Sequence, residues 1–391
     1  MEQKQIKFYS IAGCSALVLV IALVVSLKPF YRYMGQIPYL LSDSFNRTLK
    51  YYTHTNPSRQ VLLIAGPFKS GKSRAINLMA SEMENSGHFV LNIDAARASN
   101  IQDFFKLVQY EIATSLVNVR QYITSAELKL ISDVEVPELN VTCPTPIFSD
   151  PALAKPYIAF SSILEAIYHN GTFSEWAVHQ FFDLLEKYGN AIQPALFLHN
   201  IEILKAYKTD EEPFLGLKII EAAKSRLIRR DHYKDTIPIF VEIKNSFVRI
   251  GINSDIFKIV QVDAPKNAYS TFVNKYSVFR SSEFKQIESN FGLHIGTFSK
   301  IFEDLKYNVE LSAALQNLQD MISQNVNRLL TDPAAKAAGK RLCKAHGKMR
   351  MSNSTDIESL IPLFENGYLY LKKGLKVRSM NKGVTNALCS L

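Results

Sequence analysis

An eight-residue segment, Gly66-Pro-Phe-Lys-Ser-Gly-Lys-Ser73, combines glycines, lysines and serines at a spacing that suits the binding of phosphate groups. Glycines let the backbone approach an anion closely, and the amides of the loop and of the following helix donate hydrogen bonds to it. In such a loop Lys72 reaches the outer phosphates and the hydroxyl of Ser73 binds Mg²⁺. We therefore predict that ATP with Mg²⁺ contacts Gly66, Pro67, Phe68, Lys69, Ser70, Gly71, Lys72, Ser73 and Arg74, with Ser73 as the metal ligand.

This loop needs a strand before it and a helix after it. The apolar run Val61–Ala65 is typical of a short, fully buried strand, and residues 74–83 show a helical pattern. Strand, loop and helix follow one another without a break. The sequence around the loop therefore agrees with phosphate binding.

Hydrolysis of the nucleotide would also require acidic side chains at the end of a second buried strand. The predicted strand 195–198 ends instead in His199 and Asn200, and neither neutral side chain replaces a carboxylate on a hard cation. Glu202 is a candidate catalytic residue. Its alternative role is that of an acidic residue at the N-terminus of a helix. Asp94 ends another predicted strand, but at a sheet edge it would lie two or three spacings of about 4.8 Å away. We expect nucleotide binding without efficient turnover.

Short buried strands alternate with helices through the first two thirds of the chain. This alternation predicts an α/β fold in which helices cover both faces of a parallel sheet, with ligands at the carboxyl ends of the strands. The stretch 134–156 contains five prolines and is predicted to be an inserted surface loop. The predicted strands are 61–65, 89–93, 195–198, 237–243 and 257–262, and the predicted helices are 101–117, 173–187 and 214–228.

The last part of the chain is helical and then basic. Residues 331–391 hold 11 Lys or Arg and 4 Asp or Glu, a net charge of +7 out of +9 for the whole chain. Such an excess predicts contact with something acidic. Residues 268–330 are predicted to be largely helical, and they are followed by helices at 334–346 and 356–364, the second capped by Ser354 or Thr355, and by a basic hairpin at 368–371 and 375–380 that carries Lys372, Lys373, Lys376 and Arg378.

The N-terminal segment 8–27 contains 20 consecutive uncharged residues. A helix of this length spans the roughly 30 Å of bilayer hydrocarbon. A buried core helix and a cleaved secretory signal are the alternatives, but the segment is apolar on every face and longer than the usual apolar part of a signal. We predict one transmembrane helix that acts as a retained signal anchor.

The cysteines Cys14, Cys143, Cys343 and Cys389 are scattered, without a close pair or a neighbouring histidine at metal-ligand spacing. Neither a zinc site nor a disulfide framework is predicted, which favours a reducing compartment. Glycosylation patterns occur at Asn46, Asn140, Asn170 and Asn353, and they would matter only if this part of the chain faced a lumen.

Taken together, the loop, the strand ends and the basic C-terminus resemble the AAA+ superfamily, in particular the STAND and archaeal-type ATPases. The resemblance covers residues 59–391 and implies a P-loop core, a helical lid and a winged helix. It also implies that Asn245 is a polar sensor of the γ-phosphate and that Lys300 acts from the lid. The alternative for Asn245 is a turn residue, and the alternative for Lys300 is a solvated charge on a helix. The implied units are an anchor (1–30), a linker (31–58), a P-loop NTPase core (59–264), a lid (265–330) and a winged-helix-like domain (331–391).

Three functions fit these expectations. The first is a membrane-anchored, ATP-binding regulator or assembly factor, a pseudo-ATPase with weak or no hydrolysis. The second is an active AAA+ ATPase that uses Glu202, and the third is a structural subunit of a membrane complex that retains the P-loop as a scaffold. Protein partners or anionic lipid are expected, because a membrane anchor makes DNA an awkward partner. The expected location is the mitochondrial inner membrane, with the ER or another organelle membrane as the alternative.

Overall fold

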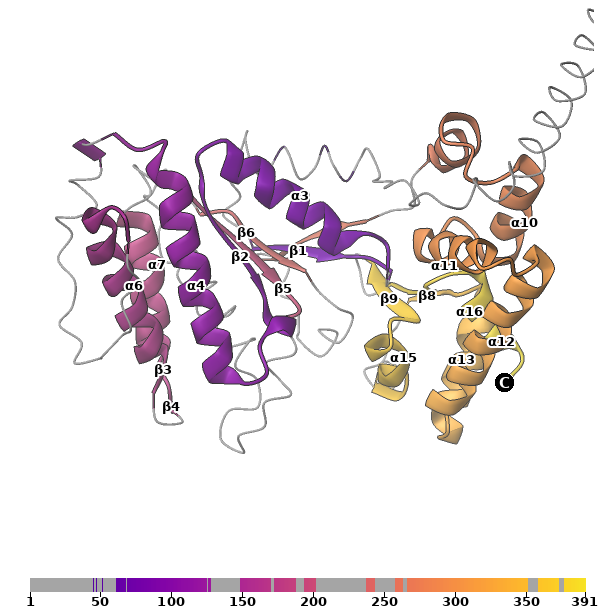
Figure 1. Ribbon diagram of the computed structural model, residues 1–391. Helices are drawn as coiled ribbons and strands as arrows, with labels where there is room; N and C mark the ends of the chain where they lie inside the picture. The colour runs from indigo at the N-terminus through magenta and orange to yellow at the C-terminus, as the bar shows by residue number, and fades with distance from the viewer. Residues whose placement is uncertain are drawn as a thin grey trace, which may run out of the picture.

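A five-stranded parallel sheet forms the centre of the N-terminal body (Figure 1). The strand order is β2-β5-β6-β1-β7, so β1 lies between strands that come much later in the chain. The strands are β1 (Val61–Ala65), β2 (Phe89–Asp94), β5 (Pro194–His199), β6 (Ile239–Glu242) and β7 (Phe257–Gln261). The computed structural model describes residues 45, 47, 51, 61–67, 69–124, 126–127, 148–169, 172–187, 193–201, 237–242, 257–262, 266–350, 358–372 and 376–391.

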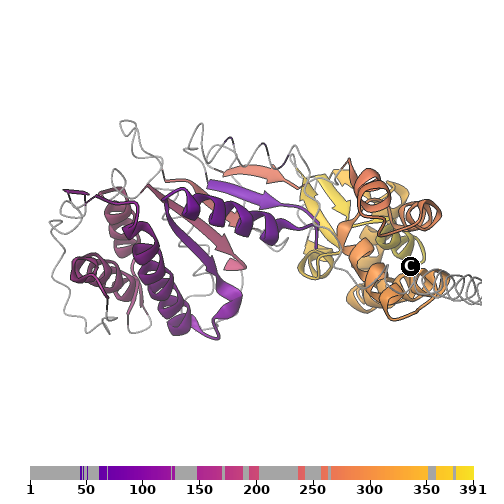
Figure 2. The same cartoon turned by 45° about the horizontal axis from the view of Figure 1, so that its top comes forward.

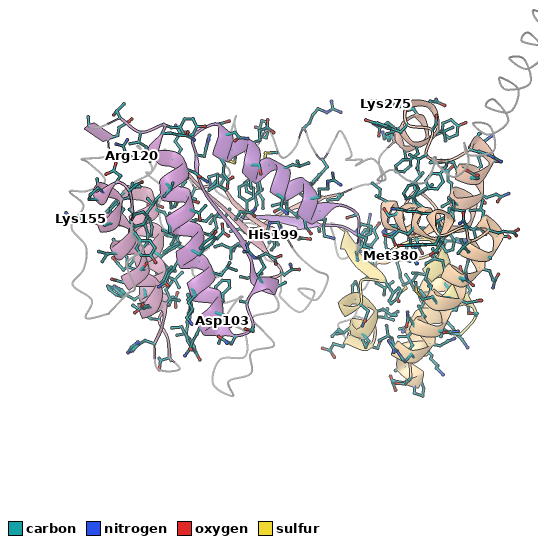
Figure 3. All side chains as sticks on the ribbon, in the orientation of Figure 1. Asp103, Arg120, Lys155, His199, Lys275 and Met380 are labelled. Atoms are coloured by element: carbon teal, nitrogen blue, oxygen red, sulfur yellow. A yellow bond between two sulfur atoms is a disulfide. The ribbon has the colours of Figure 1, made fainter. Side chains whose placement is uncertain are left out.

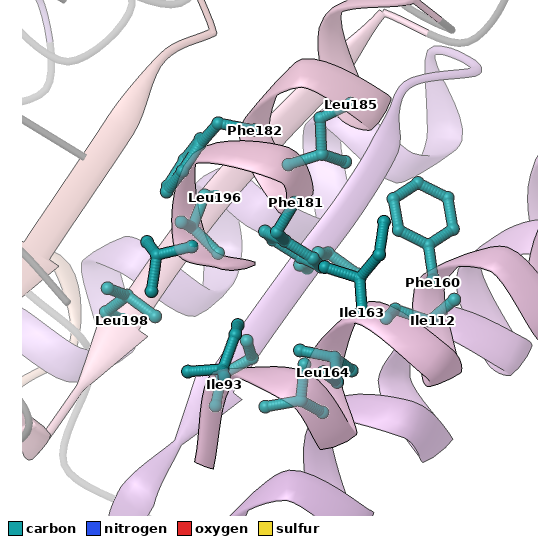
Figure 4. Close-up of a cluster of buried hydrophobic side chains, with 14 of the residues drawn as sticks. Ile93, Ile112, Phe160, Ile163, Leu164, Phe181, Phe182, Leu185, Leu196 and Leu198 are labelled. Carbon is teal, nitrogen blue, oxygen red and sulfur yellow. The ribbon is translucent and has the colours of Figure 1, made fainter. Parts of the chain in front are cut away.

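Both faces of this sheet are covered, as the apolar strands predict. Val61 and Leu63 pack into one hydrophobic cluster with helices α4 (Ile101–Arg120), α6 (Ala154–Ile167) and α7 (Glu175–Lys187). Leu62 and Ile64 point to the other face and pack against α3 (Lys72–Asn85), as the alternation of side chains along a strand requires. Figure 2 shows α3 along the sheet, and Figure 4 shows the cluster that includes Ile93, Phe160 and Phe181. The predicted α/β class is confirmed.

The helix α6 corrects the prediction of an inserted loop over 134–156. Pro151 starts a 3-10 turn, Pro151–Leu153, and Pro156 lies in the first turn of α6. Proline is tolerated there because the first amides of a helix have no intrahelical partner. The short strands β3 (Tyr168–His169) and β4 (Thr172–Phe173) then pair as a hairpin before α7. Residues 134–147 of the predicted loop lie outside the described residues.

The C-terminal body is built on a single hydrophobic core that extends from Ala268 to Leu388. The helices expected in the lid and in the basic part therefore share one core. Antiparallel pairing of β10 with β9 confirms the predicted hairpin, and β8 pairs along the other edge of β10. The elements are a π-helical turn (Ser270–Lys275), α10 (Ser281–Phe291), α11 (Ile295–Lys306), α12 (Leu311–Leu329), α13 (Pro333–Lys344), β8 (Lys348–Arg350), α15 (Ile361–Glu365), β9 (Leu369–Lys372), β10 (Lys376–Ser379) and α16 (Lys382–Cys389).

A disulfide joins Cys343 of α13 to Cys389 of α16, although no disulfide framework was predicted from the sequence. The two cysteines are 46 residues apart in sequence, and only the packing of α16 on α13 brings their Cα atoms to 5.2 Å. Spacing along the chain carries no signal for such a pair. The bond fastens the last helix to the C-terminal body.

Several predictions concern residues that the structure does not describe. These are the segment 8–27, the helix 214–228, and Ser354 and Thr355. In the described part of the chain, no helix combines the length and the apolar character that crossing a bilayer requires.

Candidate nucleotide site

The loop between β1 and α3 turns tightly at the carboxyl end of the sheet. Gly71 has φ 89°, a left-handed backbone conformation that strains any residue with a Cβ, and α3 begins directly after it. Gly66 lies against β7: a Cβ at this position would be 3.1 Å from Val262 Cβ. Both glycines of the predicted motif are therefore required by geometry. Phe68, at the loop tip, lies outside the described residues.

Lys72 is folded back onto this loop. Its ammonium group donates hydrogen bonds to the carbonyl oxygens of Gly66 at 3.0 Å and Pro67 at 2.9 Å. The side chain is buried, with 6% of its surface exposed. A buried ammonium that is held by carbonyl oxygens can exchange these acceptors for phosphate oxygens, which bind it more strongly because they are charged.

The hydroxyl of Ser70 fits a phosphate ligand. Its Oγ atom is buried and has no hydrogen-bond partner among the described residues. A buried polar atom without a partner costs roughly 1–3 kcal/mol, so such atoms usually have one. Phosphate oxygens in the loop would supply the missing acceptor.

A carboxylate that the sequence analysis did not select lies beside Ser73. Glu242 ends β6, which pairs directly with β1, and its Oε1 atom accepts a hydrogen bond from Ser73 Oγ at 2.8 Å. The side chain of Glu242 is almost fully buried. A serine hydroxyl and a carboxylate oxygen are the ligands that Mg²⁺ prefers. Two oxygen atoms of the kind that Mg²⁺ prefers therefore lie next to each other, and the carboxylate does not come from the strand on which an acid was expected.

His199 connects Glu242 to the next strand. The ring Nδ1 lies 2.8 Å from Glu242 Oε2, and Nε2 lies 2.9 Å from Asn92 Oδ1 on β2. Asn92 in turn donates from Nδ2 to Asn77 Oδ1, which leaves its Oδ1 as an acceptor. Both ring nitrogens of His199 are therefore engaged, one with a carboxylate oxygen and the other with an amide oxygen. Figure 3 places His199 at the end of the sheet that faces the C-terminal body.

These contacts set the charge of Glu242. Burial on its own raises the pKa of the Glu242 carboxyl, but hydrogen bonds from His199 and Ser73 and the charges of Lys72 and His199 outweigh burial. The pKa of Glu242 therefore lies below its ordinary value. The Glu242 carboxyl therefore favours its ionised form, near the buried ammonium group of Lys72.

The predicted strand ends are where the sequence placed them, but they do not form an acidic pair. Asn200 follows β5 and donates a hydrogen bond to Asp94 Oδ1 at 2.5 Å. Asp94 ends the edge strand β2, three strands from β1, so its predicted distance from the loop is confirmed. It also caps the 3-10 turn Ala95–Arg97 by accepting from the amide of Ala96. Asp94 therefore has a structural role at the edge of the sheet.

The remaining predicted residues fall into two groups. Glu202 and Asn245 lie outside the described residues. Lys300 is described on α11, where its ammonium group donates to Asp304 Oδ1 at 2.7 Å, and this hydrogen bond raises the pKa of Lys300. Arg74 is exposed on the first turn of α3.

The C-terminal body reaches the loop through the start of α11. A Cβ on Gly296 would lie 2.5 Å from Lys69 Cβ, so glycine is needed for the two backbones to approach. His294 caps this helix by accepting from the amide of Thr297, and Thr297 accepts a hydrogen bond from Asn381 at 3.1 Å. Strand β9 also lies against β1 (Figure 1). The loop is therefore in contact with both bodies of the molecule.

The sequence did contain a signal for Glu242. It is an acidic residue at the end of an otherwise apolar strand, Ile239-Phe-Val-Glu242. A buried acid in such a position is unusual unless it has a partner. The acid was expected on the strand that ends in His199, so Glu242 was not among the predicted site residues.

No family model and no curated protein matches the chain. Among solved structures, it is similar to a Walker-type ATPase of Pyrococcus abyssi, with 12% identity and a TM-score of 0.49 over 88% of this chain and 95% of the other. It is also similar to Cdc6p from Pyrobaculum aerophilum, with 12% identity and a TM-score of 0.31 over 92% and 97% of the two chains. Both likenesses are distant, so the functional argument rests on the loop and on Glu242.

Proposed function

We propose that the chain binds ATP with Mg²⁺ in the loop 66–73 and hydrolyses it slowly or not at all, as a nucleotide-dependent regulator or assembly factor of the AAA+ kind. The observation that carries this proposal is the hydrogen bond between Ser73 and Glu242 beside the buried Lys72. It joins a hydroxyl and a carboxylate, two metal ligands, at the start of the helix where phosphates bind.

In this proposal Ser73 and Glu242 hold Mg²⁺, and the loop amides, Lys72 and Ser70 hold the phosphates. The bound Mg²⁺ neutralises phosphate charge and orients the outer phosphates. To bind the metal, Glu242 and Ser73 give up their mutual hydrogen bond. His199 meanwhile holds Glu242 in position through the second carboxylate oxygen, Oε2.

Slow turnover follows from the same contacts. A general base must take a proton from water, and a carboxylate whose pKa is depressed is a poor proton acceptor. Of the two carboxylates that end described strands of the sheet, Glu242 is depressed in this way and Asp94 is three strands from β1. His199 occupies a position at which an active enzyme is expected to carry an acidic residue. Both of its ring nitrogens already contact other side chains, Glu242 and Asn92.

The regulatory role rests on the contact between Lys69 and Gly296. A nucleotide in the loop shifts a conformational equilibrium only if its affinity differs between the states. Because the first turn of α11 touches the loop, phosphates in the loop favour one placement of α11 over others. The uncharged segment 8–27 would hold this switch at a membrane.

The disulfide bears on the location. Disulfides persist in oxidising compartments, so the bond between Cys343 and Cys389 supports a lumenal C-terminal body and favours the ER membrane over the mitochondrial inner membrane. The four glycosylation patterns agree with this proposal. Digestion of the native protein with a peptide N-glycosidase should lower its apparent mass; an unchanged mass together with free thiols at Cys343 and Cys389 would contradict the lumenal location.

The experiment is a titration of the detergent-solubilised full chain with a fluorescent ATP analogue, with and without Mg²⁺, alongside a phosphate-release assay. We expect Lys72→Ala to weaken binding about 100-fold, because a charge-assisted contact is worth up to about 3 kcal/mol. Glu242→Gln should remove the benefit of Mg²⁺ while leaving Mg²⁺-free binding nearly intact.

The matched control is Lys340→Ala, which removes the same charge from an exposed position on α13. It should bind like the unchanged chain. Equal affinity in the Lys72→Ala variant and the unchanged chain would overturn nucleotide binding. Rapid phosphate release that survives Glu242→Gln would overturn the slow-turnover part of the proposal and favour an active ATPase.

A further inference from the structure

A cavity of about 630 Å³ opens in the C-terminal body. Its walls come from the turn between α10 and α11, from the turn before β8, from the end of β10 and from the start of α16. This volume is in the range of small-molecule sites, roughly 300–1,000 Å³. No residue of the loop 66–73 is among the described residues that line it.

The charge of this cavity is one-sided. The cations Lys348, Arg378 and Lys382 line it, and no Asp or Glu is among its described lining residues. Asparagine, serine and threonine side chains supply further hydrogen-bonding groups. A concave site with cations and neutral polar groups but without acids suits an anion.

Two of these cations lie side by side on neighbouring strands. Arg378 of β10 pairs in register with Lys348 of β8. Neither forms an ion pair with a carboxylate in the part of the chain that the structure describes, and like charges directly opposite each other on a sheet are unfavourable. An anion between them would remove this repulsion.

The walls of the cavity are held in place. Gly347 has φ 69°, and any Cβ there would collide with Ser379 and Thr385, so the turn before β8 lies tightly on β10 and α16. Asn381 caps α16 and is buried, and the disulfide at Cys389 fixes α16 to α13. Met380, which also lines the cavity, lies on the side of the C-terminal body nearest the sheet (Figure 3). The cations are therefore presented by a preorganised frame, which lowers the cost of binding.

We propose that this cavity binds a small molecule that carries two or more phosphate groups, at a site separate from the loop 66–73. Phosphates accept charge-assisted hydrogen bonds from Arg378, Lys348 and Lys382 at once. The ligand is either a soluble polyphosphate or the phosphorylated headgroup of a lipid. A duplex nucleic acid fits less well, because it needs an exposed, continuous surface and the cations here line a hollow.

The test uses the full chain with Lys72→Ala, so that the loop 66–73 does not contribute. Isothermal titration calorimetry with inorganic tripolyphosphate and with inositol 1,4,5-trisphosphate measures binding to the cavity. We expect at least one probe to bind, and Arg378→Gln or Lys348→Gln to weaken it about 10-fold or more. Tighter binding of tripolyphosphate identifies a soluble ligand, and tighter binding of the inositol phosphate identifies a lipid headgroup.

The matched control is Lys376→Gln, on the same strand as Arg378 but outside the cavity lining, and it should bind within about 2-fold of its parent. A second variant, Lys348→Glu, separates binding from folding. It places a carboxylate opposite Arg378 and should raise the unfolding temperature while abolishing binding.

Binding that is absent for both probes, or that is lost equally in Lys376→Gln, would overturn the proposal. Duplex DNA that binds more tightly than both probes would also overturn it, in favour of a nucleic-acid surface. None of these outcomes affects the nucleotide site, because its loop is already disabled by Lys72→Ala.

Discussion

Two groups of charged residues in this chain are organised in opposite ways. Around the loop 66–73, the carboxylate of Glu242 lies between Lys72 and His199 and accepts hydrogen bonds from His199 and Ser73. In the C-terminal body, Arg378 and Lys348 lie opposite each other on two neighbouring strands, and neither has a carboxylate partner among the described residues. The first group, called the balanced group below because it contains charges of both signs, gains from a cation together with a polyphosphate. The second group is unbalanced and gains from an anion alone.

The largest effect that tests this comparison comes from removing the acid of the balanced group. Glu242→Leu should lower the free energy of unfolding by about 3–5 kcal/mol, because it leaves the buried side chains of Lys72 and His199 without their partner. Adding His199→Leu should recover part of this loss, since the buried ring nitrogen that loses Glu242 as its partner is then also removed. Urea unfolding measures both values, and a loss below about 1 kcal/mol, the size for an exposed pair, would show that the network is not truly buried.

The next largest loss of stability is expected from removing the disulfide of the C-terminal body. Replacing Cys343 and Cys389 by serine opens a loop of 46 residues, which should cost about 2–4 kcal/mol of stability. The loss should appear in urea unfolding of the C-terminal body and should be reproduced by adding a reductant to the unchanged chain. Cys143→Ser is the control, because its sulfur takes no part in this bond. If neither the double substitution nor the reductant changes the urea unfolding curve, Cys343 and Cys389 carry free thiols.

A smaller effect concerns the pH dependence of the balanced group. The pKa of Glu242 is lower in the folded chain than in the unfolded one, so the folded state binds fewer protons. Its contribution to stability is present above the unfolded pKa of about 4.3 and is lost as the pH falls through the lower, folded pKa. The difference in unfolding free energy between the unchanged chain and Glu242→Gln should therefore shrink on acidification. A difference that stays constant below the unfolded pKa would refute this assignment.

The smallest effect sharpens the role of the loop. Ser70→Ala removes a buried hydroxyl that has no described partner, so it should stabilise the nucleotide-free chain by up to about 1 kcal/mol. The same change should weaken ATP binding about 5-fold, because one hydrogen bond to phosphate is lost. Thermal unfolding with and without ATP measures the two opposite shifts. Shifts of the same sign would show that Ser70 serves the fold rather than the ligand.

The sequence predicted the parts of this molecule whose signals are local. The strand 61–65, the glycine turn and the helix over 74–83 follow from neighbouring residues, and the structure confirms them, with the helix extended to Lys72–Asn85. Glu242 was missed because its place beside Ser73 depends on the order of strands in space, not along the chain. The bond between Cys343 and Cys389 was missed for the same reason. Helix α6 was missed because a proline such as Pro156 breaks a helix in most positions but is tolerated in the first turn.

The strand order has a consequence for how the chain reaches its native state. Leu62 aligns with Phe240, and Val61 aligns with Phe257, so both neighbours of β1 are synthesised nearly two hundred residues after it. Chain segments so far apart find each other slowly, because a long loop must close before any pairing is gained. Until then the apolar run of β1 has no partner on either edge, which makes it the segment most exposed to wrong pairing during biosynthesis. The phosphate loop thus acquires its shape late, once the strands on both sides have arrived.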